Sequence, residues 1–263
     1  MKALHVCKKA LLPFFVGAMY LFLYLPIILL VVLSFNASPY FYAWDGLSLQ
    51  WYRELFTSTE VWQALQNSLI VAFSAVALSL LCGVLLVFYL KRRYLRKTTL
   101  LFYGTLAAPE IVLAVGLLSA FVYFAVPLGL LTLIVGHTLI GLAYVVPMVT
   151  SRLQEMDDAL LQAAMDLGAT RGYALYSVVL PYLMPTIIGA GLLVFIISFD
   201  DFVIAFFCAG ASAQTLPLYI FSVIRSGATP MINALSTVLL AISSLLVLLF
   251  SYFIIKKGGG DYA

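Results

Sequence analysis

Mostly apolar runs of about 20 residues recur along this chain, and they restrict the possible fold more than any other feature. A run of that length allows an α-helix to cross the hydrocarbon core of a bilayer, which is roughly 30 Å thick. Six such runs are present, at about residues 10–34, 66–90, 100–124, 130–150, 185–207 and 233–255. The sequence therefore predicts an all-α, polytopic membrane protein with six transmembrane helices in a single transmembrane domain over residues 1–263.

Composition excludes an ordinary soluble domain. Hydrophobic residues make up 64% of the chain and charged residues only 10%, and the mean hydropathy is +1.11. In soluble domains roughly a quarter of the residues are charged. The three cysteines, Cys7, Cys82 and Cys208, are too scattered for a metal cluster or a disulfide framework. We therefore interpret them as small apolar fillers and expect no metal site.

The distribution of basic residues predicts the orientation in the membrane. Twelve of the 14 Lys and Arg residues fall on one side of the six runs, and only Arg53 and Arg225 fall on the other. By the positive-inside rule, both termini and the connection 151–182 are cytoplasmic. We keep the first run as a span because its apolar stretch is longer than the roughly 7–15 residues of a signal peptide.

Aromatic residues mark the opposite, external side. Trp44, Trp51 and Trp62 all lie in the first external connection, together with Tyr40, Tyr42 and Tyr52. Such rings favour the membrane–water interface, so an anchoring belt is the simplest interpretation. A docking surface for an external partner is the alternative, and the two roles can coexist.

The cytoplasmic connection 151–182 is too polar to span a membrane but has a regular pattern. Four of its apolar residues recur at three- and four-residue spacing, which predicts a short amphipathic helix: Leu160, Ala163, Ala164 and Leu167. Gly168 stands where this helix would end in a left-handed residue. Thr170 is placed to cap a second helical turn, which we expect Leu180-Pro181 to end. Alanines permit close approach of backbones, so this module suits a groove in a partner.

A helix lying on lipid is the alternative for this connection. The connection holds two basic residues, Arg152 and Arg171, but four acidic ones, Glu155, Asp157, Asp158 and Asp166. An acidic segment is unfavourable beside anionic headgroups. A protein partner is therefore the better interpretation.

The pattern Gln162-Ala163-Ala164, Gly168 and Val178-Val179-Leu180-Pro181 resembles the EAA loop of binding-protein-dependent ABC importer permeases. Gln162 stands where that family most often has glutamate, so size and hydrogen bonding are kept while the charge is lost. Further segments resemble the spermidine/putrescine permeases within the family: residues 34–36, 51–52, 67–68, 109–112, 198–201, 216–219 and 230–235.

This resemblance implies a type I ABC importer permease fold that forms half of a translocation pathway for polyamines in a bacterial inner membrane. The implied partners are a homologous second permease, two cytoplasmic ATP-binding subunits and an extracytoplasmic substrate-binding protein, with no nucleic acid. ATP and Mg would be bound by the ATPase subunits, so no cofactor is expected on this chain. The EAA-like loop would couple to the ATPase through Gln162, Ala163, Ala164, Asp166, Gly168, Ala169, Leu180 and Pro181.

Three acids lie inside the apolar runs, where ionisable residues are costly and usually functional: Glu110, Asp200 and Asp201. No Lys or Arg lies within the runs, so an internal ion pair is not expected. Pro109 should break the third run and leave Glu110 in the first turn of a half-helix. Asp200 and Asp201 point about 100° apart on a helix, so we expect one to face the pathway while the other can cap a nearby helix.

An acidic pathway with nearby aromatic rings suits an elongated organic cation such as a polyamine. The rings expected there are Phe199, Phe202 and Tyr144. Alternatively, the acids only accept backbone hydrogen bonds at helix breaks. For His137 in the fourth run, we favour a hydrogen bond between helices over a proton relay.

Other functional classes fit less well. No P-loop, G-x-S-x-G motif or metal-ligand cluster is present, which disfavours an enzyme. A self-sufficient secondary transporter usually contains an internal repeat, and none is evident. An ABC permease for another small solute, such as an iron complex, an opine or a phosphonate, remains the main alternative.

Overall fold

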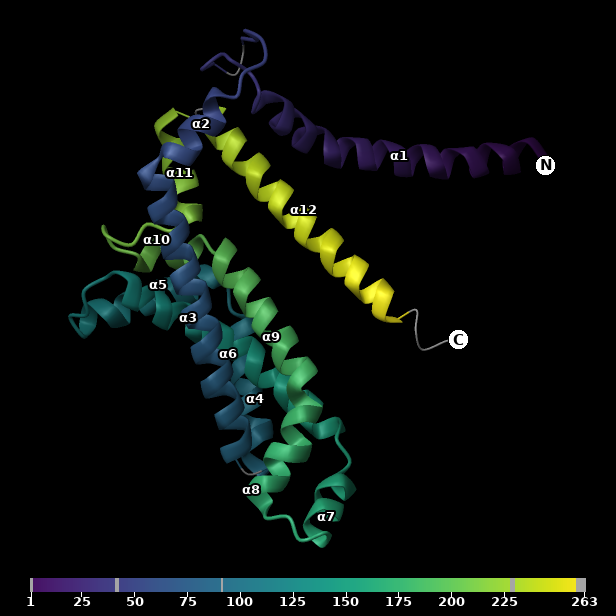
Figure 1. The fold of residues 1–263 in the computed structure, drawn as a ribbon, viewed down its shortest axis with the longest axis vertical. Coiled ribbons are helices and arrows are strands. Elements are labelled where there is room, and N and C mark those ends of the chain that lie inside the picture. Colours follow the sequence, from purple (N-terminus) through teal and green to yellow (C-terminus); the bar gives the residue numbers. More distant parts are fainter. Residues whose placement is uncertain (1, 41–42, 91, 228–229, 259–263) are drawn as a thin grey trace. The chain divides into compact units, whose positions relative to one another are not determined.

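Helices account for nearly all the regular structure of this protein. The computed structural model describes residues 2–40, 43–90, 92–227 and 230–258 (Figure 1). Its elements are α1 (Lys2–Leu33), α2 (Gln50–Thr57), α3 (Thr59–Tyr89), α4 (Arg92–Ala107), α5 (Glu110–Tyr123), α6 (Leu130–Glu155), α7 (Asp158–Asp166), α8 (Arg171–Ala174), a π-helical segment (Leu175–Val179), α9 (Leu180–Asp200), α10 (Val203–Cys208), α11 (Leu216–Gly227) and α12 (Pro230–Gly258). The only β-type pairing in the described residues is an isolated bridge between Asn36 and Leu47. The predicted all-α class is confirmed.

Four helical stretches are long and apolar enough to cross a membrane. They are Phe15–Leu33, α3, α6 and the continuous stretch Arg171–Asp200. A fifth span is possible if the bent pair Lys97–Ala107 and Glu110–Tyr123 counts as one crossing, and a shorter apolar helix covers Pro230–Leu245. By length and composition the described residues thus hold four or five candidate spans, and the count of six stays a prediction.

The break at Pro109 is confirmed. The helix axis bends there by 105° between α4 and α5. Proline has no N–H and disfavours the helical conformation in the residue before it, so α4 ends at Ala107. The Pro109 carbonyl instead accepts the Val112 N–H at 2.9 Å and starts α5. The third run is therefore not one straight helix, and Glu110 is the first residue of α5, as predicted.

The helix that carries the fifth apolar run has other limits than the run itself. The helix begins at Arg171 rather than 185 and ends at Asp200 rather than 207. Leu180-Pro181 does not terminate a helical turn, because a π-helical turn over residues 175–179 leads directly into α9. The Leu180 N–H donates to the Leu175 carbonyl, five residues back, and this wider turn accommodates the proline that follows.

Chain contacts group the molecule into two compact units, residues 60–219 and residues 1–59 with 220–263. In the first unit α3, α6 and α9 run side by side (Figure 1) around a core that includes Val87, Val145, Leu183 and Val194. A second core cluster joins α5, α6 and α10 through Ala114, Leu133, Ile204 and Cys208. Cys208 is buried, as expected for a filler, whereas Cys82 is exposed and the side chain of Cys7 lies outside the described residues.

In the second unit, α12 contacts α1 and α2, and the connection before α2 is ordered by polar contacts. The buried Asn36 side chain accepts the Asp45 N–H at 3.1 Å and donates to the Ala43 carbonyl at 2.6 Å. The Trp51 Nε1–H donates to the Asn36 carbonyl at 2.7 Å. Trp51 therefore has a structural role in this connection, while Trp44 is exposed.

Gly141 lies where three helices of the first unit approach one another closely. A Cβ at this position would lie 2.8 Å from Ser79 of α3 and 2.9 Å from Val194 of α9. Gly141→Ala should therefore push the helices apart and destabilise the fold by roughly 1–3 kcal/mol. Gly189→Ala, where the new Cβ would meet nothing within 4 Å, is the matched control. Thermal unfolding in detergent should show a lower midpoint for Gly141→Ala only, and equal midpoints would contradict this close approach.

Candidate functional site

Two of the three acids within the apolar runs meet where several helices begin or end. Glu110 opens α5, and Asp201 follows the last residue of α9 in an extended conformation, with φ −68° and ψ 125°. The two carboxyl groups lie within hydrogen-bonding reach of each other. Because helix α5 contacts α10 and α6, residues from separate apolar runs converge there.

Asp201 also caps the short helix that follows it. Its Oδ2 accepts the Ala205 N–H at 3.0 Å, and its Oδ1 accepts the Ile204 N–H at 3.5 Å. Only 8% of the residue is exposed. The prediction that one of the two aspartates caps a helix is confirmed, and the capping residue is also the one that contacts Glu110.

Asp200 and the nearby aromatic residues lie outside the Glu110–Asp201 pair. Asp200 is exposed at the end of α9, and within the described structure it forms no hydrogen bond with the acid pair. Phe199 stacks on Phe195, with ring centroids 5.8 Å apart, and Phe202 packs against Phe206 with centroids 5.5 Å apart. These rings lie in sequence beside Asp201.

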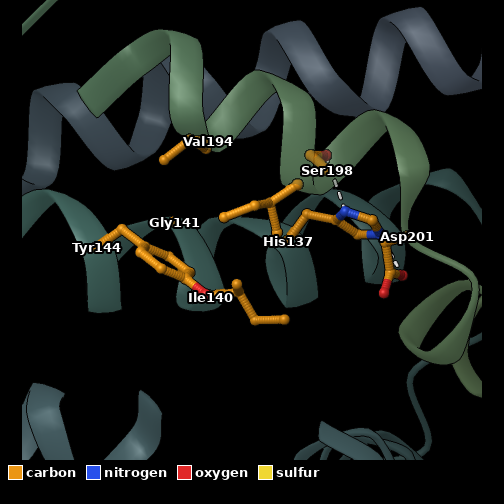
Figure 2. Close-up of a pocket in the computed structure, with 8 residues that line it drawn as sticks. His137, Ile140, Gly141, Tyr144, Val194, Ser198 and Asp201 are labelled. Carbon is orange, nitrogen blue, oxygen red and sulfur yellow. Dashed lines mark hydrogen bonds and ion pairs between the residues drawn. The ribbon is translucent and has the colours of Figure 1, made fainter. Parts of the chain in front are cut away.

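His137 is the functional candidate whose place in the site the sequence did not reveal. The residue is 3% exposed, its Nδ1 lies 2.8 Å from Ser198 Oγ, and its Nε2 lies 3.4 Å from Asp201 Oδ2 (Figure 2). The expected hydrogen bond between helices is present. Among the described residues no Lys or Arg pairs with these acids, as expected, but a histidine stands beside Asp201.

The sequence signal for this contact was weak. His137 and Ser198 lie in mostly apolar helices and are far apart in the chain. Only the crossing of α6 and α9 shows that they face each other. The pairing of His137 with Ser198 and Asp201 is therefore information from the tertiary structure.

A small cavity lies between α6 and α9 beside this cluster (Figure 2). Its volume is about 10 Å³, and its lining includes His137, Tyr144, Val194 and Asp201. A single water molecule needs roughly 10–15 Å³, so the cavity is too small for an organic substrate. Tyr144 lines the cavity at the end away from Asp201 (Figure 2). Among the described residues, no group of three His, Cys, Asp or Glu side chains is arranged to hold a metal ion.

The predicted helix–glycine–helix module over 151–182 is present, with one boundary changed. Helix α7 begins earlier than the apolar spacing indicated, because Asp157 caps it by accepting the Ala159 N–H at 2.9 Å. Gly168 has the left-handed φ of +90° that was expected. Thr170 caps α8 by accepting the Tyr173 N–H at 3.4 Å.

Much of the surface of this module is exposed in the described part of the chain. Gln162, Ala163 and Asp166 are exposed, Ala164 and Ala169 are half-buried, and Leu167 is 90% exposed. An open groove of about 580 Å³ runs along the corner between α7 and α8, past Ala164, Leu167, Gly168, Ala169, Thr170 and Tyr173. Leu180 and Pro181, which were expected to belong to the same surface, lie instead at the start of α9.

The module is joined firmly to the transmembrane helices. Arg152 at the end of α6 forms a 2.9 Å ion pair with Glu155, and its guanidinium lies 4.3 Å from the centre of the Tyr182 ring in α9. Met156, at the C-cap of α6, is buried in the core. Helix α7 itself contacts the π-helical segment 175–179, so a force applied to α7 can reach α9 through direct contacts.

Comparisons with known proteins give consistent results. Residues 75–257 match the family described as "Binding-protein-dependent transport system inner membrane component". The spermidine/putrescine transport system permease protein PotC of Haemophilus influenzae is 38% identical over 246 residues, which cover 92% of this chain and 95% of that protein. The putrescine transport system permease protein PotI of Escherichia coli is 38% identical over 229 residues, covering 83% and 82%.

The fold has solved counterparts. The crystal structure of a bacterial alginate ABC transporter, in complex with an alginate pentasaccharide-bound periplasmic protein, contains a chain that matches with a TM-score of 0.66. The sequence identity is 18%, and the match covers 96% of this chain and 94% of the other. At this identity the likeness concerns the fold alone.

Proposed function

Because the chain belongs to the family of binding-protein-dependent transport system inner membrane components, we propose that it is a permease subunit of an ATP-driven polyamine importer. It is a transport subunit and not an enzyme, since its relatives are permease proteins. ATP hydrolysis is the work of partner subunits, which also hold ATP and Mg.

Spermidine and putrescine are the proposed substrates. Relatives that are named for these polyamines match this chain over most of their length. The observation in the structure that supports the proposal is the Glu110–Asp201 pair, two acids within hydrogen-bonding reach of each other at a helix break. An elongated chain with ammonium groups needs acidic contacts along its path and little else that is charged. We propose that Asp200, Phe199 and Tyr144 contribute to the same path at neighbouring depths.

The proposed assembly contains one copy of this permease, a homologous second permease, two ATP-binding subunits and an extracytoplasmic binding protein. We propose six membrane crossings in a single transmembrane domain, with both termini in the cytoplasm of a bacterial inner membrane. The surplus of Lys and Arg on one side supports this orientation. The broken pair α4–α5 would then form one crossing, and α12 the last.

The corner between α7 and α8 is the proposed contact with the ATPase. Its exposed Leu167 and its groove offer apolar surface that a partner can cover. Gln162, Ala163 and Asp166 line the exposed side of α7 and complete this contact. Leu180 and Pro181 contribute indirectly, because they start the helix that receives the movement.

The substrate class is tested by competition. Cells that express this chain with its partners should take up labelled putrescine and spermidine. Excess unlabelled polyamine should reduce that uptake at least tenfold, whereas ferric chelates, opines and phosphonates should leave it unchanged. Uptake that a ferric chelate or a phosphonate suppresses, and polyamines do not, would assign the permease to another solute.

A further inference from the structure

His137 has one ring nitrogen with a partner and one without. Its Nδ1 is paired with Ser198 at 2.8 Å, but its Nε2 is fully buried and has no hydrogen-bond partner among the described residues. The nearest acidic oxygen is Asp201 Oδ2, at 3.4 Å. A buried polar atom normally has a partner, so an unpaired nitrogen aimed at a carboxylate requires an explanation.

Ser198 Oγ can accept from Nδ1 or donate to it, and the acidic oxygen beside Nε2 favours the tautomer in which Ser198 donates. A hydroxyl that donates to Nδ1 leaves the ring proton on Nε2, the nitrogen that faces Asp201. Ser198 lies on the last turn of α9, and Asp201 follows that helix directly. The imidazole of α6 therefore reaches both the end of α9 and the carboxylate that starts α10 (Figure 2).

The other partners of Asp201 show when a hydrogen bond from the His137 Nε2–H is needed. Its two oxygens accept the Ile204 and Ala205 N–H groups, and its other side-chain partner is Glu110. A hydrogen bond between two carboxyl groups requires one proton, because ionised carboxylates only accept. An ammonium group can replace that proton as the donor between the two acids. When it does, Asp201 is fully charged, and the Nε2–H of His137 is the free donor nearest to it.

We propose that His137 is a positioning residue of the polyamine path, which holds the Asp201 carboxylate for an ammonium group through its Nε2–H. This rests on the proposed function, in which Glu110 and Asp201 contact the substrate. His137 itself is too buried to contact a substrate in the pathway. Its role is to supply a donor to Asp201 when the proton shared with Glu110 is displaced.

Two amide variants separate this role from simple filling of space. His137→Gln places its amide nitrogen close to the position of Nε2 and can still donate to Asp201. His137→Asn places its amide close to Nδ1, so it keeps the Ser198 contact and loses the one to Asp201. The two variants are both neutral, both amides and close in size, so that loss of packing affects them similarly.

The readout is polyamine imported per ATP hydrolysed by the complete complex in proteoliposomes. Damage to the fold lowers assembly and hydrolysis together, whereas misplacement of Asp201 lowers import for each ATP. We expect His137→Asn to reduce this ratio about tenfold and His137→Gln to stay within about threefold of the unmodified protein. In an Asp201→Asn background, His137→Asn should have no further effect, because residues that act as a unit are not additive.

Each outcome has one meaning. Equal ratios in the Gln and Asn variants, whether both low or both unchanged, would overturn the positioning role. A further tenfold loss on combining His137→Asn with Asp201→Asn would also overturn it, because the histidine would then act independently of Asp201. If Asp201→Asn alone leaves the ratio unchanged, the acid path itself is wrong. An effect of Asp201→Asn without any effect of His137→Asn contradicts only the present inference.

Discussion

Replacing Gly168 by Asp is expected to abolish polyamine uptake, with a loss of at least 100-fold. Gly168 has a φ of +90°, a conformation that residues with a side chain rarely adopt. The new carboxylate would also stand in the groove between α7 and α8 that is proposed to contact the ATPase. Burying an unpaired charge in such a contact is strongly unfavourable. The measurement is uptake of labelled putrescine, together with copurification of the ATPase.

Gly172→Asp is the matched control. Gly172 lies only four residues later in the same connection, is also exposed, and a Cβ there would meet nothing within 4 Å. It is not among the residues with positive φ, so the substitution brings the same charge without the strain. We expect uptake within about twofold of the unmodified protein. If Gly168→Asp transports as well as this control, the corner does not couple the permease to the ATPase, and a self-sufficient carrier becomes the better explanation.

Loss of charge at Asp201 or Glu110 is the second change with a large expected effect. Asp201→Asn keeps an oxygen that can accept from Ala205 and so preserves the cap of α10, but it removes the negative charge. Glu110→Gln likewise removes the negative charge of the other acid and keeps a side-chain oxygen that can accept a hydrogen bond. A hydrogen bond to a charged group contributes about 1.5–3 kcal/mol, which corresponds to a decrease in uptake of roughly 10- to 100-fold for each variant.

The readouts are initial uptake rates for putrescine and spermidine, with recovery of the assembled complex measured in parallel. Glu60→Gln serves as a control, because Glu60 lies in the first turn of α3 and is exposed. Assembly should be unchanged in all three variants, and uptake should fall only for the two site acids. Normal uptake in both Asp201→Asn and Glu110→Gln would mean that these acids only stabilise the helix break.

The sequence was informative where a single residue type has a strong local effect. Pro109 forces a break that no neighbouring contact can remove, and Gly168 and Thr170 end and begin helices through backbone geometry and capping. Pro181 was misleading for a related reason. A proline normally ends a helix, but a preceding π-helical turn accommodates it, and the chain from Arg171 to Asp200 continues as one stretch.

The candidate site was only partly predictable. The three acids stood out because charges are rare in apolar runs. Two adjacent aspartates point in different directions on a helix, so one of them was expected to cap a nearby helix. The pairing of Glu110 with Asp201 depends on how α5 packs against α10, which periodicity does not encode. The same holds for His137, whose partners lie on α9 and at the start of α10.

The most direct test of the central claim is uptake of labelled putrescine into proteoliposomes. They would contain this chain with its partner permease, both ATP-binding subunits and the external binding protein. ATP or a non-hydrolysable analogue would be supplied on the side of the ATPase. We predict accumulation with ATP, no accumulation with the analogue, and loss of accumulation when unlabelled spermidine is added in excess. Accumulation that is equal with ATP and with the analogue, or that spermidine does not reduce, would contradict an ATP-driven polyamine importer.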